Sequence, residues 1–473
     1  MRLVPPPDDG FDDDDYTPEP DDERGAVEQL RPLLERGDDV ELGGRLLGVL
    51  GRRGRVVYAD GSAYVYSAER GLYVVIDRAE ESRIVQSYAG APVRSRNKGT
   101  PVPLRLGAGH VRGAIDLAHD QASEPLFFSG APAGVAFSNG WVTVGADGIQ
   151  IAPHSPDHRA RHAYDFDFEP GSVPSRLLTY FAQVFEGDDD ASDKVRLLRE
   201  HAGLSLLGLA PLFQSCVLGI GEGSNGKSVW NEVAQWCMPI GSVCAIPPQL
   251  WADQYRRAQL AGMLFNVVSE LPESDILDSA AFKAIVVGDS TNARHIYGPP
   301  FDFRPRAGHL FSANTLPGTR DQTHSFWRRF IIVSWNRRFE RGAPGTDTTL
   351  AQKLMAERNA IVPWLLEGAR EALTRGHYTV PESHAGLLEA WRRGTDSVAE
   401  FFHRMTEPLP DTASPGHGIT PTTLYGEYRE WARANGLSPV SSQKFGGRAK
   451  RLGYGSEHGH GPRLYRVRMV DDE

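Results

Sequence analysis

The chain has 473 residues, which is too long for one ordinary hydrophobic core, so we expect two to four domains. Hydrophobic residues make up 40% and charged residues 24%, which is normal for a soluble globular protein. No apolar run reaches about 18 residues and the N-terminus lacks a signal-peptide stretch, so a cytoplasmic protein without membrane spans is expected. The three cysteines, Cys216, Cys237 and Cys244, have neither the spacing of a zinc site nor a plausible disulfide framework. Each lies among apolar residues, so we expect buried thiols.

The net charge of -10 comes from one N-terminal stretch. Residues 8–23 contain ten acidic residues and no Lys or Arg, and the rest of the chain has 51 acidic and 51 basic residues. Residues 1–25 are therefore predicted to be a disordered acidic tail. Two roles stay open for it: a solubilising leader, or a partner-binding tail such as a DNA mimic that shields a basic groove.

Residues 26–208 are predicted to form an N-terminal module that is first β-rich and then helical. Its opening has the apolar spacing of a helix, with Val27, Leu30, Leu33 and Leu34. Residues 55–152 alternate short β-rich runs with turn signals at Asp60-Gly61, Arg70-Gly71, Asn139-Gly140 and Asp147-Gly148. Residues 174–208 predict two helices around an acidic loop.

The remainder divides into three parts. Residues 209–378 alternate apolar strands with helices up to about residue 340, which predicts an α/β domain with a mainly parallel sheet. A helical stretch follows at 349–376, interrupted by Pro363. Residues 379–421 read as a helical segment and a Pro- and Gly-rich linker, and residues 422–473 as helix, helix and basic hairpin.

Residues 221–228, GEGSNGKS, fit the phosphate-loop pattern G-x-x-x-x-G-K-[ST]. An apolar, strand-like run precedes them and a helix-forming run follows, which is the context that a true phosphate loop needs. Glycines let backbone N–H groups face phosphate oxygens, Lys227 can reach the β and γ phosphates, and the Ser228 hydroxyl can bind Mg²⁺. The expected nucleotide contacts are Gly221, Glu222, Gly223, Ser224, Asn225, Gly226, Lys227, Ser228 and Val229.

A second carboxylate is expected near the metal. The apolar run from Met263 to Val268 ends in Ser269-Glu270, so Glu270 is placed to polarise water beside Mg²⁺ and to help hold the ion. Glu273 is the weaker candidate. The alternative is that Glu270 only caps a strand at the surface.

Two further strand ends carry polar residues. Asn314 ends the apolar run in GHLFSANTLPG, where an amide can sense the γ-phosphate, although a turn before Pro-Gly also explains it. Arg328 and Arg329 precede the apolar run Phe330–Trp335, and an arginine there can act as a finger across a subunit interface. A solvated basic pair at the start of a strand is the alternative.

A basic hairpin is predicted between Glu270 and Asn314. Residues 293–297 and 301–304 alternate around the turn Gly298-Pro299-Pro300. Its flanks carry Arg294, His295, Arg304 and Arg306, and basic and aromatic residues interleaved on a hairpin suit a single nucleic-acid strand. The C-terminal helix offers a second DNA contact, with Lys444 and Arg448, unless it docks on the ATPase domain instead.

This order of motifs resembles the superfamily 3 helicases of viruses, phages and plasmids. The phosphate loop, the strand-end SE, the basic hairpin, the strand-end AN and WRR occur within about 110 residues. The phage/plasmid primase-helicase family, related to the poxvirus primase-helicase, is the most similar. The likeness covers roughly residues 55–470 and rests mainly on the loop and on GDSTNARHIYGPPFDFRP.

The resemblance implies an α/β P-loop NTPase core of the AAA+-like, superfamily 3 type, with a C-terminal winged helix. It implies an ATP- and Mg²⁺-dependent DNA helicase that forms a ring, a hexamer in this family, and moves on single-stranded or forked DNA, usually 3′ to 5′. Phage, prophage or plasmid replication proteins are then expected partners. It makes Asn314 the sensor, Arg329 or Arg328 the interface finger, and Gly298–Phe301 the pore loop.

Two departures from the family stand out. Ser269 precedes Glu270 where many relatives have paired acids, so Mg²⁺ would depend on Ser228, phosphates and water. Fewer than 60 residues precede the family-like region, so no primase domain is expected in this chain. A competing hypothesis is a DNA-binding replication factor whose ATPase only switches its assembly. A small-molecule P-loop kinase would need a substrate lid and an acceptor site, and neither is evident.

Overall fold

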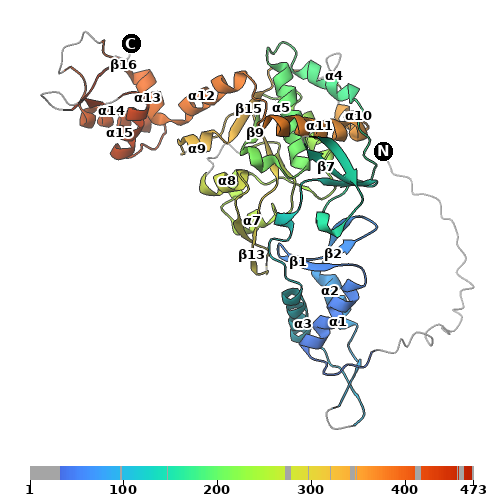
Figure 1. Cartoon of the computed structure of the whole chain (residues 1–473). Coiled ribbons are helices and arrows are strands. Elements are labelled where there is room, and N and C mark those ends of the chain that lie inside the picture. The colour runs from blue at the N-terminus through green and yellow to red at the C-terminus, as the bar shows by residue number, and fades with distance from the viewer. Residues whose placement is uncertain are drawn as a thin grey trace, which may run out of the picture. The chain divides into compact units, whose positions relative to one another are not determined.

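The computed structural model describes residues 32–95, 99–145, 147–271, 279–296, 298–319, 321–340, 347, 349–410, 417–454, 456–457 and 463–470. The predicted acidic tail and Glu273 lie outside these ranges. The chain forms two compact units (Figure 1). Unit 1 comprises residues 1–49 and 78–121, and unit 2 comprises residues 50–77 and 122–473, so these boundaries cut across the predicted 26–208 module. No helix among the described residues is long and apolar enough to cross a membrane.

Unit 1 combines helices with a short hairpin, namely α1 (Asp39–Gly51, whose end passes into unit 2), α2 (Arg78–Gln86), β4 (Pro92–Val93), β5 (Val102–Pro103) and α3 (Ala108–Gln121). The predicted helical start at Leu33 and Leu34 is wrong, because Leu34 pairs with Val93 in a β-bridge. The first helix begins only at Asp39, where the Asp38 carboxylate accepts a hydrogen bond from the N–H of Glu41. Helices α2 and α3 were not predicted, because residues 55–152 showed mainly strand and turn signals.

Unit 2 begins with two antiparallel three-stranded sheets, built from β1 (Val56–Ala59), β2 (Ser62–Ser67), β3 (Leu72–Ile76), β6 (Val135–Phe137), β7 (Gly140–Gly145) and β8 (Gly148–Ala152). Asp60 and Gly61 turn the chain between β1 and β2 with φ of 50° and 75°, as two-residue hairpin turns require. The other three predicted turn dipeptides also lie between neighbouring strands.

The centre of unit 2 is a five-stranded parallel sheet in the order β10-β11-β14-β9-β15. Two helices, α4 (Ser175–Val184) and α5 (Ala191–Leu206), precede it as predicted, around the loop 185–190. Its elements are β9 (Cys216–Ile220), α6 (Lys227–Trp236), β10 (Val243–Cys244), α7 (Gln254–Ala258), β11 (Phe265–Val268), α8 (Ser279–Val286), β12 (Thr291–Arg294), β13 (Pro300–Phe303), β14 (Gly308–Ala313), α9 (His324–Trp327) and β15 (Phe330–Ser334).

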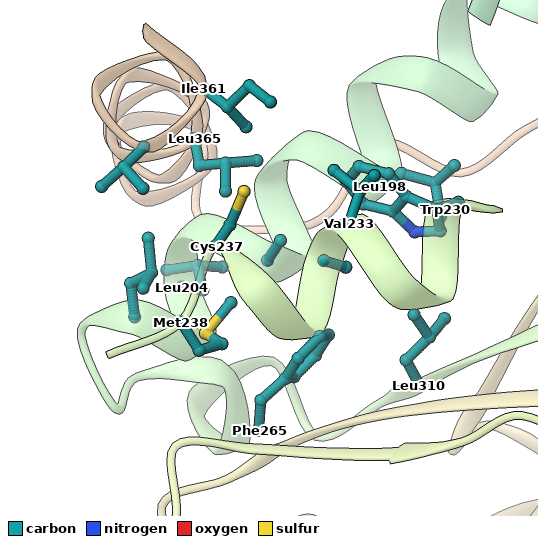
Figure 2. Packing of buried hydrophobic residues seen from close by; sticks show 14 of the residues in the cluster. Leu198, Leu204, Trp230, Val233, Cys237, Met238, Phe265, Leu310, Ile361 and Leu365 are labelled. Atoms are coloured by element: carbon teal, nitrogen blue, oxygen red, sulfur yellow. The ribbon is translucent and has the colours of Figure 1, made fainter. Parts of the chain in front are cut away.

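Helix α6 is packed between the sheet and two other helices. Its apolar face lies against sheet residues below it and against α5 and α11 (Arg358–Arg375) above it (Figure 2). The labelled residues of this cluster are Leu198, Leu204, Trp230, Val233, Cys237, Met238, Phe265, Leu310, Ile361 and Leu365. Burial on both sides fixes α6, and with it the loop that precedes the helix. Cys216 and Cys237 are buried free thiols as predicted, and Cys244 is half-buried.

The C-terminal part contains α10 (Leu350–Met355), α11, α12 (Ser383–Thr395), α13 (Ser397–Met405), β16 (Thr406–Pro408), α14 (Pro421–Ala434), α15 (Ser442–Arg451), β17 (Ser456–Glu457), β18 (Leu464–Tyr465) and β19 (Val467–Met469). The prediction that Pro363 interrupts the helical stretch is wrong. Pro363 lies within α11, and the break between helices falls before Arg358. Helix α13 shares one core with α14 and α15, through Phe401, Tyr428 and Phe445, so the C-terminal module starts before residue 422.

Candidate functional site

The loop 221–226 joins β9 to α6, so the strand and the helix predicted around it are both present. Gly223 and Gly226 have φ of 99° and 88°, which glycine adopts at little cost. A Cβ at Gly221 would lie 2.6 Å from the Trp335 carbonyl oxygen, so only glycine fits where the loop leaves the strand. These positions let the loop curl back over the N-terminus of α6, where backbone N–H groups favour an anion.

Lys227 is the first residue of α6 and is only 5% exposed. Its Nζ donates to the carbonyl oxygens of Gly221 (2.9 Å) and Ala313 (2.8 Å), and to Asn314 Oδ1 (3.3 Å). Burial lowers the pKa of Lys227, and the negative charge of Glu270 partly offsets this. A phosphate group beside this ammonium would stabilise its charged form in the same way.

Strand β14 brings Asn314 between Lys227 and Glu270. It lies between β9 and β11 in the sheet, with Phe311 opposite both Leu218 and Val268. The N–H of Leu271 donates to the Ser312 carbonyl (2.7 Å), which fixes the chain directly after Glu270. Asn314 and Glu270 are both exposed at the carboxyl edge of the sheet. Three of the predicted site residues therefore share one edge, where parallel α/β sheets bind ligands.

The residues at this edge fit a nucleotide with Mg²⁺. Ser228 is exposed in the first turn of α6, one residue beyond Lys227, and the helix N-cap is a glycine without a side chain. Among the residues that the structure describes, no cluster of three or more His, Cys, Asp or Glu side chains is placed to hold a metal ion. A divalent ion here would depend on Ser228, Glu270, water and phosphate oxygens, which suits Mg²⁺ rather than a tight protein-only cage.

The sequence did not reveal the side chains that hold the loop from outside. The Tyr180 hydroxyl on α4 donates to the Gly226 carbonyl (3.0 Å), and Val184 lies 2.7 Å from where a Cβ on Gly226 would be. Asn225 is 4% exposed, and its Nδ2 donates to the Trp335 carbonyl (3.3 Å). Tyr180 occupies an ordinary apolar helix position, so its spacing signals core packing and not contact with the loop.

Arg328 and Arg329 lie at the opposite, amino edge of the sheet, directly before β15. Arg329, the predicted finger, is 6% exposed and its Nη1 donates to Gln214 Oε1 (3.0 Å), whereas Arg328 is exposed. Five residues of β15 separate this edge from the edge that carries the loop. At about 3.3 Å per residue they span about 16 Å. Neither arginine can therefore reach the loop of its own chain.

The predicted basic hairpin is present as β12 and β13, with Ala293 paired to Phe301. The rings of His295 and Phe301 stack, with centroids 4.9 Å apart. Both rings approach the turn between β1 and β2, because a Cβ at Gly61 would lie 2.8 Å from His295 and 2.9 Å from Phe301. His295 Nε2 is 3.2 Å from the Asp60 carbonyl oxygen. These two predicted DNA contacts instead pack against another part of unit 2.

The exposure of the other hairpin residues varies, and Arg294 and Gly298 are half-buried like His295 and Phe301. Arg294 Nε donates to the Gly298 carbonyl (2.8 Å), which closes the turn. Arg304 is exposed, and Ile296 beside the turn is 72% exposed. Only residues 304–307 separate the hairpin from β14, so the hairpin also belongs to the amino edge of the sheet.

The basic helix predicted near the C-terminus is α15. Lys444 is exposed, as are Lys450 and Arg451. Arg448 is only 9% exposed and pairs with Asp396 (Nη1 to Oδ1, 3.0 Å) at the start of α13. Arg448 thus stabilises the module, and its position in an exposed-looking basic run gave no sign of this.

Part of the chain matches a family model described as a family of unknown function (DUF5906), over residues 220–329. Two viral proteins named "Putative helicase" are similar to it. L207/L206 of Acanthamoeba polyphaga mimivirus is 23% identical over 240 residues, or 46% of this chain and 24% of that protein. Protein 184R of Invertebrate iridescent virus 6 is 29% identical over 133 residues, or 25% and 14%. The matches thus span about a quarter or less of these relatives.

Solved structures of the NrS-1 C-terminal region in its apo form overlap with this chain at 11% identity. One covers 75% of each chain with a TM-score of 0.45, and another covers 78% of this chain and 81% of that chain with 0.46. By sequence, this chain is related over part of its length to viral helicase-type proteins.

Proposed function

We propose that this chain is an ATP-dependent DNA helicase of a phage, prophage or plasmid replication system, and that its subunits assemble into a ring, as a hexamer. The observation that carries the proposal is the meeting of Lys227, Asn314 and Glu270 at one edge of the parallel sheet. Lys227 Nζ lies 3.3 Å from Asn314 Oδ1, and burial lowers the pKa of Lys227 while the negative charge of Glu270 raises it. The similarity of part of the chain to two viral proteins named as putative helicases supports the same conclusion.

Each residue has a defined role in this proposal. The loop N–H groups and Lys227 bind the β and γ phosphates of ATP, and Ser228 with Glu270 holds Mg²⁺. The metal ion, when bound, neutralises charge that develops on the phosphates. Glu270 accepts a proton from the attacking water or orients it, and Asn314 positions that water near the γ-phosphate.

The position of Arg328 and Arg329 supports a ring. Since the amino edge lies about 16 Å from the carboxyl edge along β15, an arginine at residue 328 can act only on the nucleotide of a neighbouring subunit. We assign this role to Arg328 in place of Arg329, because Arg328 is exposed and Arg329 is buried against Gln214. Assembly then completes each ATP site.

DNA contact is assigned to the exposed basic residues of two places. On the hairpin this residue is Arg304, and the half-buried Arg294 and Gly298 shape the turn beside it. His295 and Phe301 hold the hairpin against the Asp60–Gly61 turn instead of stacking on bases. On α15 they are Lys444, Lys450 and Arg451, whose phosphate contacts would orient a duplex or fork without reading its sequence.

The direct test is unwinding of a forked DNA by the full chain. We expect strand separation that requires ATP and Mg²⁺ and is absent in Lys227→Ala, together with rings in electron micrographs with an ATP analogue and DNA. ATP hydrolysis without strand separation, with assembly that changes with nucleotide, would favour the competing function of an assembly-switching replication factor. The exposed basic residues of α15 suit binding to duplex DNA, which such a replication factor would also need.

A further inference from the structure

A small pocket in unit 2 lies beside the hairpin and away from the loop that follows β9. It is lined by residues 158–162 after β8, by Phe128 and nearby residues up to Trp141, by Gly262 and Leu264 before β11, and by Arg306 just before β14. Its cavity volume is about 40 Å³. Since one water needs about 10–15 Å³ of such volume, the pocket can hold a few waters or one small polyatomic anion.

Three arginines line the pocket, and no Asp or Glu is among its lining residues. Arg159 Nη1 donates to the Phe127 carbonyl (2.8 Å), and Arg306 donates through Nη1 to Phe128 (3.4 Å) and through Nη2 to Leu207 (3.3 Å). These carbonyl partners hold the guanidinium groups in place but carry no negative charge. Because each guanidinium has five N–H groups, donors remain for a further acceptor.

Two aromatic side chains add donors to the same wall. Trp141 is 4% exposed and lines the pocket, and among the described residues its indole N–H has no hydrogen-bond partner. A buried unpaired donor is costly, so an acceptor in the pocket would stabilise it. His158 stacks on Trp141, with centroids 4.8 Å apart. His158 Nδ1 accepts from the N–H of Ser155 (3.2 Å), which leaves the proton of the neutral ring on Nε2.

The charge balance also favours an anion. Burial and the nearby positive charge of Arg161 lower the pKa of Arg306 to about 10. One carboxylate, that of Asp60, lies 2.7 Å from Arg161 Nη1, and it comes from outside the pocket lining. Three guanidinium groups therefore converge on a pocket in which one carboxylate partner is supplied. A bound anion would relieve this repulsion.

We propose that this pocket binds a backbone phosphate of the single DNA strand that passes the hairpin. Asp60 links the two places, because its carboxylate bonds Arg161 and its carbonyl oxygen meets His295 on the hairpin. Arg306 follows the last hairpin residue, Phe303, by three positions. A strand held at the hairpin thus finds a phosphate site nearby. The assignment rests on the proposed DNA-binding function, and a free phosphate ion shares the same chemistry.

The test uses Arg159→Gln in the full chain. Arg159 donates to the Phe127 carbonyl and lies over the Phe127 ring, and it forms no ion pair with the residues that the structure describes, so the change leaves no buried acid unpaired. Arg196→Gln is the matched control, since Arg196 lies on α5, is 49% exposed and pairs only loosely with Asp193 (3.7 Å). Oligothymidylate binding is measured by fluorescence anisotropy from low to high salt. In parallel, the Trp141 indole N–H signal, assigned with Trp141→Phe, is followed by NMR.

Loss of one phosphate contact should weaken oligothymidylate binding about tenfold at low salt and reduce the salt slope by about 0.7. The control should match the wild type. The Trp141 signal should shift with oligothymidylate in the wild type and not in Arg159→Gln.

Three results would overturn the assignment. One is wild-type DNA binding by Arg159→Gln with an unchanged salt slope. A second is a Trp141 signal that ignores bound oligothymidylate. A third is a signal that moves only with inorganic phosphate, which would make this a free-phosphate site. Absence of any DNA binding by the wild type would instead reject the proposed function.

Discussion

The carboxyl and amino edges of the central sheet differ in how directly the sequence specifies them. At the carboxyl edge, Lys227, Glu270 and Asn314 each follow a strand within a few residues, and the parallel sheet brings them together. At the amino edge, Arg329, His295 and Phe301 lie where the sequence places them but are engaged in packing by distant segments. Strand ends fix the first edge locally, whereas contacts between remote segments decide the second.

The largest effect should come from Arg328, the arginine that we propose acts across subunits. Arg328→Ala should lower ATP turnover by about 10³ or more, because it removes charge stabilisation at the neighbour's γ-phosphate. Partial recovery is expected when Arg328→Ala and Lys227→Ala subunits, each inactive alone, are mixed in one ring. Arg329→Gln should mainly lower the unfolding temperature, since Arg329 is buried beside Gln214. Mixed rings without recovery would show that Arg328 does not act on the nucleotide of a neighbouring subunit.

At the carboxyl edge, Glu270→Gln should bind ATP normally and hydrolyse it about 10² or more times slower, because an amide cannot accept the proton of water. Nucleotide affinity from a fluorescent ATP analogue and turnover from phosphate release separate the two steps. Glu273→Gln is the matched control, as a second acid after the same strand. An active Glu270→Gln beside an inactive Glu273→Gln would show that the wrong carboxylate was chosen.

At the amino edge, exposed and packed hairpin residues should behave differently. Arg304→Gln should weaken single-stranded DNA binding about tenfold and leave the unfolding temperature near that of the wild type, because Arg304 is exposed. Phe301→Leu should lower the unfolding temperature instead, since its ring stacks on His295 against the Asp60–Gly61 turn. Equal loss of DNA binding in both variants, with neither destabilised, would show that Phe301 contacts DNA as Arg304 does.

The smallest effect concerns two buried histidines, His201 on α5 and His309 on β14. Burial lowers the pKa of His201 and of His309 to about 3. As the pH falls below 6.5 the unfolded chain binds protons that the folded chain does not, so stability should fall with pH. The loss should be less than about 1 kcal/mol per histidine between pH 7 and pH 6. Urea unfolding at both values tests this, with His309→Gln reducing the pH dependence and the exposed His324→Gln leaving it unchanged.

Much of the fold was predictable from local patterns. Buried strands were recognised from apolar runs, and the turns at Asp60-Gly61 and Asn139-Gly140 from their dipeptides. The helix predicted around Leu33 and Leu34 does not form, because Leu34 pairs in a β-bridge with Val93, 59 residues away. Such pairing depends on segments that no local window contains.

The candidate site shows the same division. The loop motif, Glu270 and Asn314 were predictable because each is defined by its own strand. The contacts of Tyr180 and Asn225 were not predictable, because they join distant parts of the chain. Tyr180 bonds the Gly226 carbonyl 46 residues away, and Asn225 bonds the Trp335 carbonyl 110 residues away. Arg448 was predicted to contact DNA because its partner, Asp396, lies 52 residues away between α12 and α13, in a stretch that the sequence assigned to a helical segment and linker.

If the chain is a helicase, single-stranded DNA bound near the amino edge should control ATP hydrolysis at the carboxyl edge. The most direct measurement is steady-state ATP turnover of the wild type with single-stranded DNA, with duplex DNA and without DNA. Single-stranded DNA should raise turnover several-fold over the other two conditions, Arg304→Gln should lose that increase, and Lys227→Ala should abolish turnover throughout. Wild-type turnover that depends on Lys227 but is the same in all three conditions would show that DNA does not control ATP hydrolysis by this chain.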